Sequence, residues 1–296
     1  MVKKMSLETL GICLGFLGAV FQAFNYAFTK DCAEKYKLRG LRQLICVHLG
    51  LFVLVIFPFF YYKLWQHMSW ELIFDTLWAS IPYLVAQYLM IITLTMTDSS
   101  IVSPLLTIKI PVLAVIALLF LDKGFSFNQY LSIAAIIALG VYFSSISGRI
   151  KLLPLFLVTI VCFMYAVSDL GMAEFMRDWP EDNRAMSICG CICYQFMFCG
   201  LIAMPFLKIK RFHLDLSNVY QAKNIAIAWM ISDIFFVVCF NLAGVVETSI
   251  VQALRSVLGV IIAYLFYKNY IHDENTFKRK MVTACLMFVA VASFYI

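Results

Sequence analysis

Long runs of apolar residues dominate this sequence and constrain its fold more than any other feature. Runs of about 20 residues with one charge or none are typical of helices that cross a lipid bilayer. The sequence holds ten such runs, and the loops between them are too short for a soluble domain. We therefore predict an all-α polytopic membrane protein with ten transmembrane helices. The predicted spans are Leu10–Thr29, Leu41–Tyr62, Leu77–Thr97, Ile101–Leu121, Phe127–Ser147, Leu152–Met172, Met186–Leu207, Ile225–Leu242, Ser249–Tyr267 and Met281–Ile296.

Composition agrees with this prediction and excludes several classes of protein. Hydrophobic residues make up 63% of the chain and charged residues 14%, against roughly 25% charged in a soluble domain. The net charge of +6 comes from short basic loops, which orient membrane proteins, so we expect no nucleic-acid partner. Cys189, Cys191 and Cys193 form a C-x-C-x-C pattern, but on a helix the middle thiol points away from the other two. We therefore expect neither a metal site nor a cofactor.

An internal repeat divides the chain into two halves. The stretch "SSIVSPLLTIKIPVLAVIALLF" (99–120) and the stretch "TSIVQALRSVLGVIIAYLF" (248–266) share Ser-Ile-Val, a single cation and a final Leu-Phe. We predict two five-helix repeats, residues 1–148 and residues 149–296. The pairs matched at one constant shift are Lys109 with Arg255, Tyr83 with Trp229, Gln87 with Asp233, and His48 with Tyr194.

The odd number of helices in each half determines how the halves are related. A second copy of five helices enters the membrane from the opposite side, so the two repeats are inverted. Many transporters have this architecture, with a binding site at the repeat interface near the bilayer midplane. We therefore predict a central cavity between the two halves.

This layout resembles the drug/metabolite transporter superfamily, and specifically its EamA-like members. The stretch "SSIVSPLLTIKIPVLAVIALLFLDKG" (99–124) resembles that family's fourth helix, which contains proline before an apolar run and ends in a small charged turn. The second copy, ending in "LFYKNYIHDE" (265–274), lacks the prolines. The resemblance covers nearly the whole chain in layout. It implies a solute carrier and does not name a solute.

Four charged residues lie inside predicted spans: Lys109, Asp169, Asp233 and Arg255. Each costs about 2.5–3.5 kcal/mol at a helix centre on insertion scales, so we expect all four to face the interior of the bundle. Lys109 lies about 12 Å from the start of its predicted helix, so its ammonium could instead extend to the membrane interface. A purely structural pairing of cation with carboxylate is a second alternative.

Polar and aromatic side chains share helix faces with these charges and complete the predicted solute site. Aromatic faces hold rings or cations, and charged groups fix the ionic groups of a solute. Asn25 and His48 have a competing role as hydrogen-bonding groups between packed helices. Asp169 and Asp233 are the candidates for carrying a coupling proton. The predicted substrate-binding residues are Lys109, Arg255, Asp233, Gln87, Tyr83, Trp229, Asp169, Tyr165, Asn25, Gln22, His48 and Gln252.

Loop charges give a prediction of orientation. With alternate loops counted, six Lys and Arg residues lie on the side of the termini and fifteen on the other side. The positive-inside rule then places both termini outside the cell, whereas the resemblance implies cytoplasmic termini. We expect the plasma (inner) membrane as the location.

The sequence favours a secondary transporter that moves a small zwitterionic or anionic organic metabolite by alternating access. A lipid flippase or scramblase is an alternative, because its polar groove would lie in a similar fold. An intramembrane enzyme is less favoured, since neither H-E-x-x-H nor G-x-S-x-G occurs. Besides the solute, we expect membrane lipids as partners. Faces of small residues on the fifth and tenth spans offer a contact either for another helix or for a second protomer in a homodimer.

Overall fold

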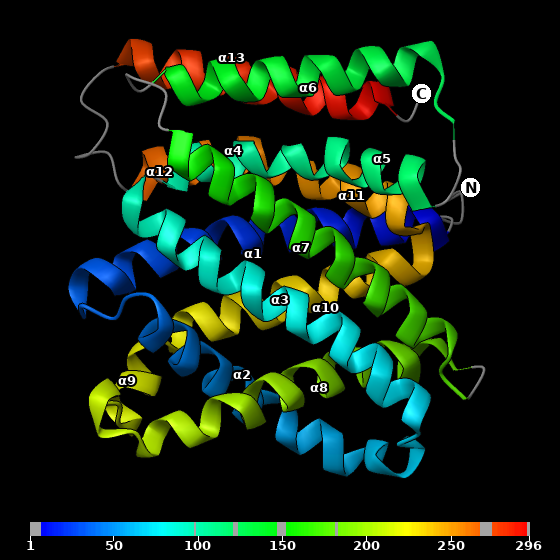
Figure 1. The fold of residues 1–296 in the computed structure, drawn as a ribbon, viewed down its shortest axis with the longest axis vertical. Helices are drawn as coiled ribbons and strands as arrows, with labels where there is room; N and C mark the ends of the chain where they lie inside the picture. Colours follow the sequence, from blue (N-terminus) through cyan, green and yellow to red (C-terminus); the bar gives the residue numbers. More distant parts are fainter. Residues whose placement is uncertain are drawn as a thin grey trace, which may run out of the picture.

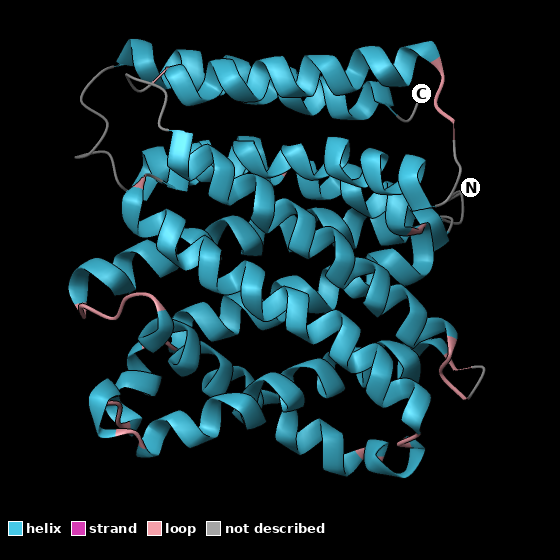
Figure 2. Ribbon diagram, in the orientation of Figure 1, coloured by secondary structure: helices cyan, strands magenta, loops and turns pink. Residues whose placement is uncertain are grey.

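The structure, a computed structural model, is built from helices (Figures 1 and 2). It describes residues 7–97, 99–120, 124–146, 152–180, 183–266 and 274–294, and no strand occurs in these ranges. The all-α prediction is therefore confirmed for the described chain. The predicted boundary between the two halves, at residues 148 and 149, lies outside the described residues.

In the part of the chain that the structure describes, six helices are long and apolar enough to cross a membrane, which makes this an integral membrane protein. They correspond to the first, second, third, sixth, seventh and eighth predicted spans. Helix α1 begins and ends beyond its predicted span, and α8 continues into the 3-10 helix η3 (Met204–Lys208). The six are α1 (Leu7–Lys35), α2 (Leu41–Tyr61), α3 (Trp70–Met96), α7 (Leu152–Arg177), α8 (Arg184–Ala203) and α10 (Lys223–Ala243).

The fourth and ninth predicted spans are each interrupted near the middle. The fourth consists of α4 (Ser99–Leu105), the 3-10 helix η2 (Leu106–Ile108) and α5 (Lys109–Phe120). Pro111 explains this break, because its ring clashes with the carbonyl four residues earlier and its nitrogen cannot donate a hydrogen bond. The prediction of one continuous helix here was wrong in this respect.

The ninth predicted span is divided into α11 (Val245–Ala253) and α12 (Arg255–Phe266). It contains no proline. The turn is made at Leu254, whose amide donates to the carbonyl of Val251 at 3.1 Å, three residues back instead of four. The fifth and tenth predicted spans are α6 (Phe127–Ser145) and α13 (Glu274–Phe294). Among the described residues, the apolar stretches of the fourth, fifth and ninth spans are all shorter than those of the six long helices.

Short helices occupy the loops. The 3-10 helix η1 (Leu64–His67) follows α2, and η4 (Lys210–Phe212) and α9 (Leu216–Gln221) follow η3. Asp215 caps α9 by accepting a 2.8 Å hydrogen bond from the Asn218 amide, while the Asn218 side chain accepts one from the Asp215 amide. This loop therefore holds α9 beside the start of α10.

Helices from distant parts of the chain pack in pairs. Helix α1 lies along α10, α3 lies along α7, α2 packs on α8, and α6 packs on α13 (Figure 1). The α3–α7 pair is in close contact at Gly171, where an added Cβ would lie 2.6 Å from the backbone nitrogen of Ala79. Glycine is required at this position by the close approach of the two backbones.

We predict that Gly171→Ala lowers the free energy of unfolding by about 1–3 kcal/mol, because the new methyl group meets backbone that cannot rotate away. Thermal unfolding of the purified protein in detergent measures this loss. Gly124→Ala is the control, since an added Cβ there has no atom within 4 Å. Equal stability of the two variants would contradict the assignment of a tight α3–α7 contact.

Candidate functional site

A buried polar cavity lies where α3, α7 and α10 meet the two interrupted segments. The cavity has a volume of about 40 Å³, which is enough for a few water molecules. Pockets for organic ligands are much larger, at several hundred Å³. A larger solute therefore requires the surrounding helices to separate. The lining residues are Gln22, Tyr83, Lys109, Tyr165, Ser168, Asp169, Met172, Trp229, Asp233, Phe236, Val237, Phe240, Gln252 and Arg255.

Both intramembrane cations follow directly after a helix break. Lys109 is the first residue of α5 and Arg255 is the first residue of α12. Both side chains are buried, at 4% exposure each. Lys109 therefore does not lie deep within a continuous helix, as the sequence suggested, but at a break, and it is too buried to extend to the interface.

Lys109 is neutralised within the cavity. Its ammonium forms an ion pair and hydrogen bond with Asp169 of α7 and donates a second hydrogen bond of 3.1 Å to Oε1 of Gln252. The Lys109–Asp169 pair connects α5 to α7, and Gln252 adds a link to α11. Such pairing lowers the cost of burying both charges in a bilayer.

Arg255 has a neutral partner instead. Its Nη1 donates to Oε1 of Gln22 on α1 at 2.9 Å, and its Nε is buried without a hydrogen-bond partner. No carboxylate lies within ion-pair distance of Arg255 among the described residues. The guanidinium thus retains an uncompensated positive charge at the cavity wall.

Asp233 is the complementary case. Its Oδ2 accepts a hydrogen bond of 3.2 Å from Nε1 of Trp229, one turn earlier on α10. Neither Lys109 nor Arg255 forms an ion pair with it. The cavity therefore holds one satisfied ion pair and, separately, one cation and one carboxylate without ionic partners.

The two interrupted segments are also joined to each other. The hydroxyl of Ser103 on α4 donates a 2.7 Å hydrogen bond to the backbone carbonyl of Arg255, while Gln252 of α11 accepts from Lys109. An added Cβ at Gly259 of α12 would lie 2.5 Å from the Ser103 hydroxyl, so the segments are in close contact. Each segment thus bonds the cation-bearing residue of the other.

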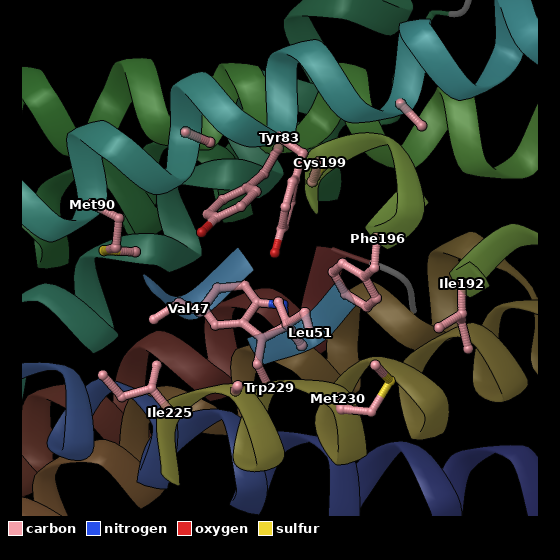
Figure 3. Packing of buried hydrophobic residues seen from close by; sticks show 14 of the residues in the cluster. Val47, Leu51, Tyr83, Met90, Ile192, Phe196, Cys199, Ile225, Trp229 and Met230 are labelled. Carbon is pink, nitrogen blue, oxygen red and sulfur yellow. The ribbon is translucent and has the colours of Figure 1, made fainter. Parts of the chain in front are cut away.

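Aromatic rings cover one side of the cavity. The Tyr83 ring from α3 meets the Trp229 ring from α10 edge to face, with centroids 6.0 Å apart (Figure 3). The Tyr165 hydroxyl of α7 accepts a hydrogen bond of 2.8 Å from Nε2 of Gln87. These rings form an amphipathic wall that suits an organic solute.

Nine of the twelve predicted site residues line this cavity, and three lie behind it. Gln87 contacts the site through Tyr165, and the His48 ring packs edge to face on Tyr83 at 5.6 Å. Asn25 points elsewhere, and its Nδ2 donates to the carbonyl of Ile225 at 2.9 Å, which ties α1 to α10. Asn25 therefore has the helix-joining position that was its alternative role.

Sequence reasoning missed five lining residues. Phe236, Val237 and Phe240 follow Asp233 at three, four and seven positions, which places them on the same helix face. Extending the face of Asp233 along α10 would have found them. On α7, Met172 follows Asp169 at three positions and shares its face, whereas Ser168 directly precedes Asp169 and is not found by this spacing.

The three cysteines of the C-x-C-x-C pattern do not line this cavity. The thiols of Cys189 and Cys193 are 4.0 Å apart on successive turns of α8, while Cys191 is directed elsewhere and is buried. Within the described ranges, no cluster of three or more His, Cys, Asp or Glu side chains is arranged to hold a metal ion.

Comparisons with known proteins establish the fold and no more. No family model and no curated protein matches the sequence. Twelve chains of solved structure match, and one of them, described only as "Crystal structure of protein", has a TM-score of 0.58 at 11% sequence identity. That match covers 97% of this chain and 96% of the other. The similarity therefore extends over the whole fold.

We predict that Lys109→Gln or Asp169→Asn alone destabilises the protein by about 3–5 kcal/mol, because each leaves an unpaired buried charge. The double variant loses less than the sum of the two single losses, since neither charge remains. Thermal unfolding in detergent gives the comparison.

The exposed ion pair between Glu174 and Arg177, on the same helix, is the matched control. Its neutralisation, Glu174→Gln with Arg177→Gln, changes stability by less than about 1 kcal/mol. Additive losses from Lys109→Gln and Asp169→Asn would show that the two buried groups do not interact.

Proposed function

We propose that this protein is a secondary transporter that moves a small zwitterionic or anionic organic solute across the membrane by alternating access. The observation that carries the proposal is the buried cavity between two interrupted helices, in which Arg255 and Asp233 lack ionic partners. A solute with a carboxylate and an ammonium group, or with an anionic group alone, supplies the missing charge. Amino acids, carboxylates and nucleotide-like metabolites have this chemistry.

Matched interactions support an inverted repeat of residues 1–148 and 149–296. Lys109 of α5 pairs with Asp169 of α7, and its counterpart Arg255 of α12 donates to Gln22 of α1. The sequence shift that relates the two cations also brings Gln22 to within one position of Asp169. The α3–α7 pair likewise corresponds to the α10–α1 pair. The same symmetry supports ten crossings in the manner of EamA-like transporters.

The interrupted segments supply a mechanism for opening. In transporters of this architecture, discontinuous helices meet at the midplane and one group of helices rocks against another. The bonds that Ser103 and Gln252 make across the two breaks are the contacts that a rocking motion has to exchange. Solute binding would replace the contacts of Arg255 with Gln22 and of Asp233 with Trp229 by ionic contacts. This stronger binding favours the conformation that admits the solute.

Asp233 is the better candidate for a coupling proton. Asp169 is paired with the Lys109 ammonium, whereas Asp233 has only an indole donor. Taking up a proton at Asp233 removes an unpaired charge from the apolar interior, and releasing it restores the partner for a cationic group of the solute.

We predict that proteoliposomes containing the protein exchange a solute from a labelled panel of amino acids, carboxylates and nucleotide-like metabolites. Arg255→Ala or Asp233→Asn reduces the exchange at least tenfold, because each removes one charged contact of about 1.5–3 kcal/mol. Asp233→Asn also abolishes any dependence of uptake on a pH gradient.

Arg184→Ala and Asp178→Asn are the matched controls, since Arg184 is the first residue of α8, Asp178 lies in the loop before it, and neither lines the cavity. They retain full exchange. Movement of lipid headgroups in place of soluble metabolites would overturn the carrier in favour of a flippase. No movement of either class would leave neither proposal standing.

The distribution of basic residues between the two ends of the bundle supports a proposal for its orientation. The end of α1 (Lys35), the start of α10 (Lys223) and η4 (Lys210) lie at one end of the bundle, where Figure 1 shows α9. The loop with Lys63 and the end of α7 (Arg177) lie at the opposite end, with the start of α1 and the end of α13. We propose that the more basic end faces the cytoplasm of a cell whose plasma (inner) membrane holds the protein.

We predict that cysteine introduced by Lys63→Cys reacts with a membrane-impermeant maleimide in intact cells, and that Lys210→Cys reacts only after permeabilisation. Both residues are exposed, Lys63 in the turn after α2 and Lys210 at the start of η4, so the solvent access of the two thiols is matched. The reverse labelling pattern would place the termini in the cytoplasm.

A further inference from the structure

A second, two-part hollow lies on the outside of the α1–α10 pair, separate from the central cavity. Its first part is an apolar groove of about 370 Å³, and its second part is a polar pocket of the same volume at the ends of the helices. Phe28 and Asn224 line both parts, so the groove opens directly into the pocket. Neither part shares a residue with the central cavity.

The groove is built from one face of each helix. Phe21, Phe24 and Phe28 recur along α1, and Ile227, Ala228 and Ile231 recur along α10 at helical spacing. Ile227 is 45% exposed, on a surface where the surrounding medium is hydrocarbon. This wall offers van der Waals contact to an acyl chain and no hydrogen bond.

The pocket carries two lysines at the end of the groove. Lys35 is the last residue of α1 and Lys223 is the first residue of α10. Their ammonium groups lie over the Tyr36 and Tyr220 rings, at 5.2 and 3.7 Å from the ring centroids, and neither forms an ion pair with a described acidic side chain. The two cations are therefore available to a common anion.

The remaining polar side chains suit a hydroxylated headgroup. Asp31 lines the pocket beside the lysines, together with Ser217, Gln221 and Asn224. One carboxylate against two ammonium groups leaves the pocket net positive, and the carboxylate can accept a hydrogen bond from a headgroup hydroxyl.

The dimensions match one leaflet of a bilayer. From Lys223 to Ile231 along α10 is about 12 Å, and from Lys35 back to Phe21 along α1 is about 21 Å. Half of a typical hydrocarbon core is about 15 Å. The pocket also lies at the more basic end of the bundle, and basic protein segments at a membrane surface attract anionic lipids.

From this combination we infer that the protein binds one anionic glycerophospholipid at a specific site on the α1–α10 seam. Lys35 and Lys223 hold the phosphate, Asp31 accepts from the headgroup, and the groove between the phenylalanines and Ile227 holds an acyl chain. The site does not depend on the transport proposal, because none of its residues touches the central cavity. It does connect the lipid to α10, the helix that carries Trp229 and Asp233.

Native mass spectrometry of the delipidated full chain, titrated with dioleoyl phosphatidylglycerol, tests the inference. We expect saturable binding of one lipid, with dioleoyl phosphatidylcholine binding at least tenfold more weakly. Lys35→Gln with Lys223→Gln weakens phosphatidylglycerol binding about 25-fold, at about fivefold for each lysine. Ile227→Trp, which fills the groove without changing charge, also weakens it.

The matched control is Lys208→Gln with Lys210→Gln, which removes the same charge from exposed positions at the same end of the bundle. Its affinity for phosphatidylglycerol stays unchanged. If the control weakens phosphatidylglycerol binding as much as the Lys35 and Lys223 variant does, the lipid is attracted to the basic surface in general and the specific site is contradicted. If phosphatidylcholine binds as tightly as phosphatidylglycerol, the proposed selection of an anionic headgroup is contradicted. Competition by inorganic phosphate alone, at the affinity of the lipid, would identify a free-phosphate site instead. Thermal unfolding without lipid confirms that each variant is folded.

Discussion

The cost of placing charge inside a membrane governs this structure. Lys109, Asp169, Asp233 and Arg255 each carry an insertion penalty of about 2.5–3.5 kcal/mol, and the fold meets that cost by directing all four into one polar cavity. Two helices are interrupted at that depth, and each resumes at a cation. Where backbone in a membrane departs from a regular helix, it has to be enclosed by protein, and here the two breaks enclose one another through the bonds of Ser103 and Gln252.

The central cavity holds one ion pair and two charges without ionic partners, and this difference is the basis of the proposed function. The Lys109–Asp169 pair is complete without a ligand and holds α5 to α7. Arg255 and Asp233 are incomplete, with an amide and an indole as their partners. A fully paired interior would have no electrostatic reason to admit a solute, whereas a wholly unpaired one would be too costly to fold. With Lys109 and Asp169 paired, and Arg255 and Asp233 without ionic partners, the protein can both fold and attract a solute.

The sequence was most informative about properties that depend on side-chain type and spacing. Apolar runs predicted the helical class, and the charges within them identified most of the cavity wall, because a buried charge in a bilayer has few alternatives. The break before Lys109 was less accessible, although Pro111 is a visible cause. The break at Leu254 has no proline and depends on packing between segments distant in sequence, such as Gly259 against Ser103. Asn25 was misplaced for a related reason, since an amide bonds equally well to a solute or to the Ile225 carbonyl.

The pairing of α1 with α10 and of α3 with α7 has a consequence for biosynthesis. Gly11, Gly15 and Gly18 of α1 lie against side chains of α10, and Gly171 of α7 lies against the backbone of α3. Every one of these tight seams joins a segment made early by the ribosome to one made much later. Helices α1 and α3 must therefore wait in the bilayer with their packing surfaces open until their partners emerge, and neither half of the chain, expressed by itself, has the complementary surfaces that would let it reach a compact state.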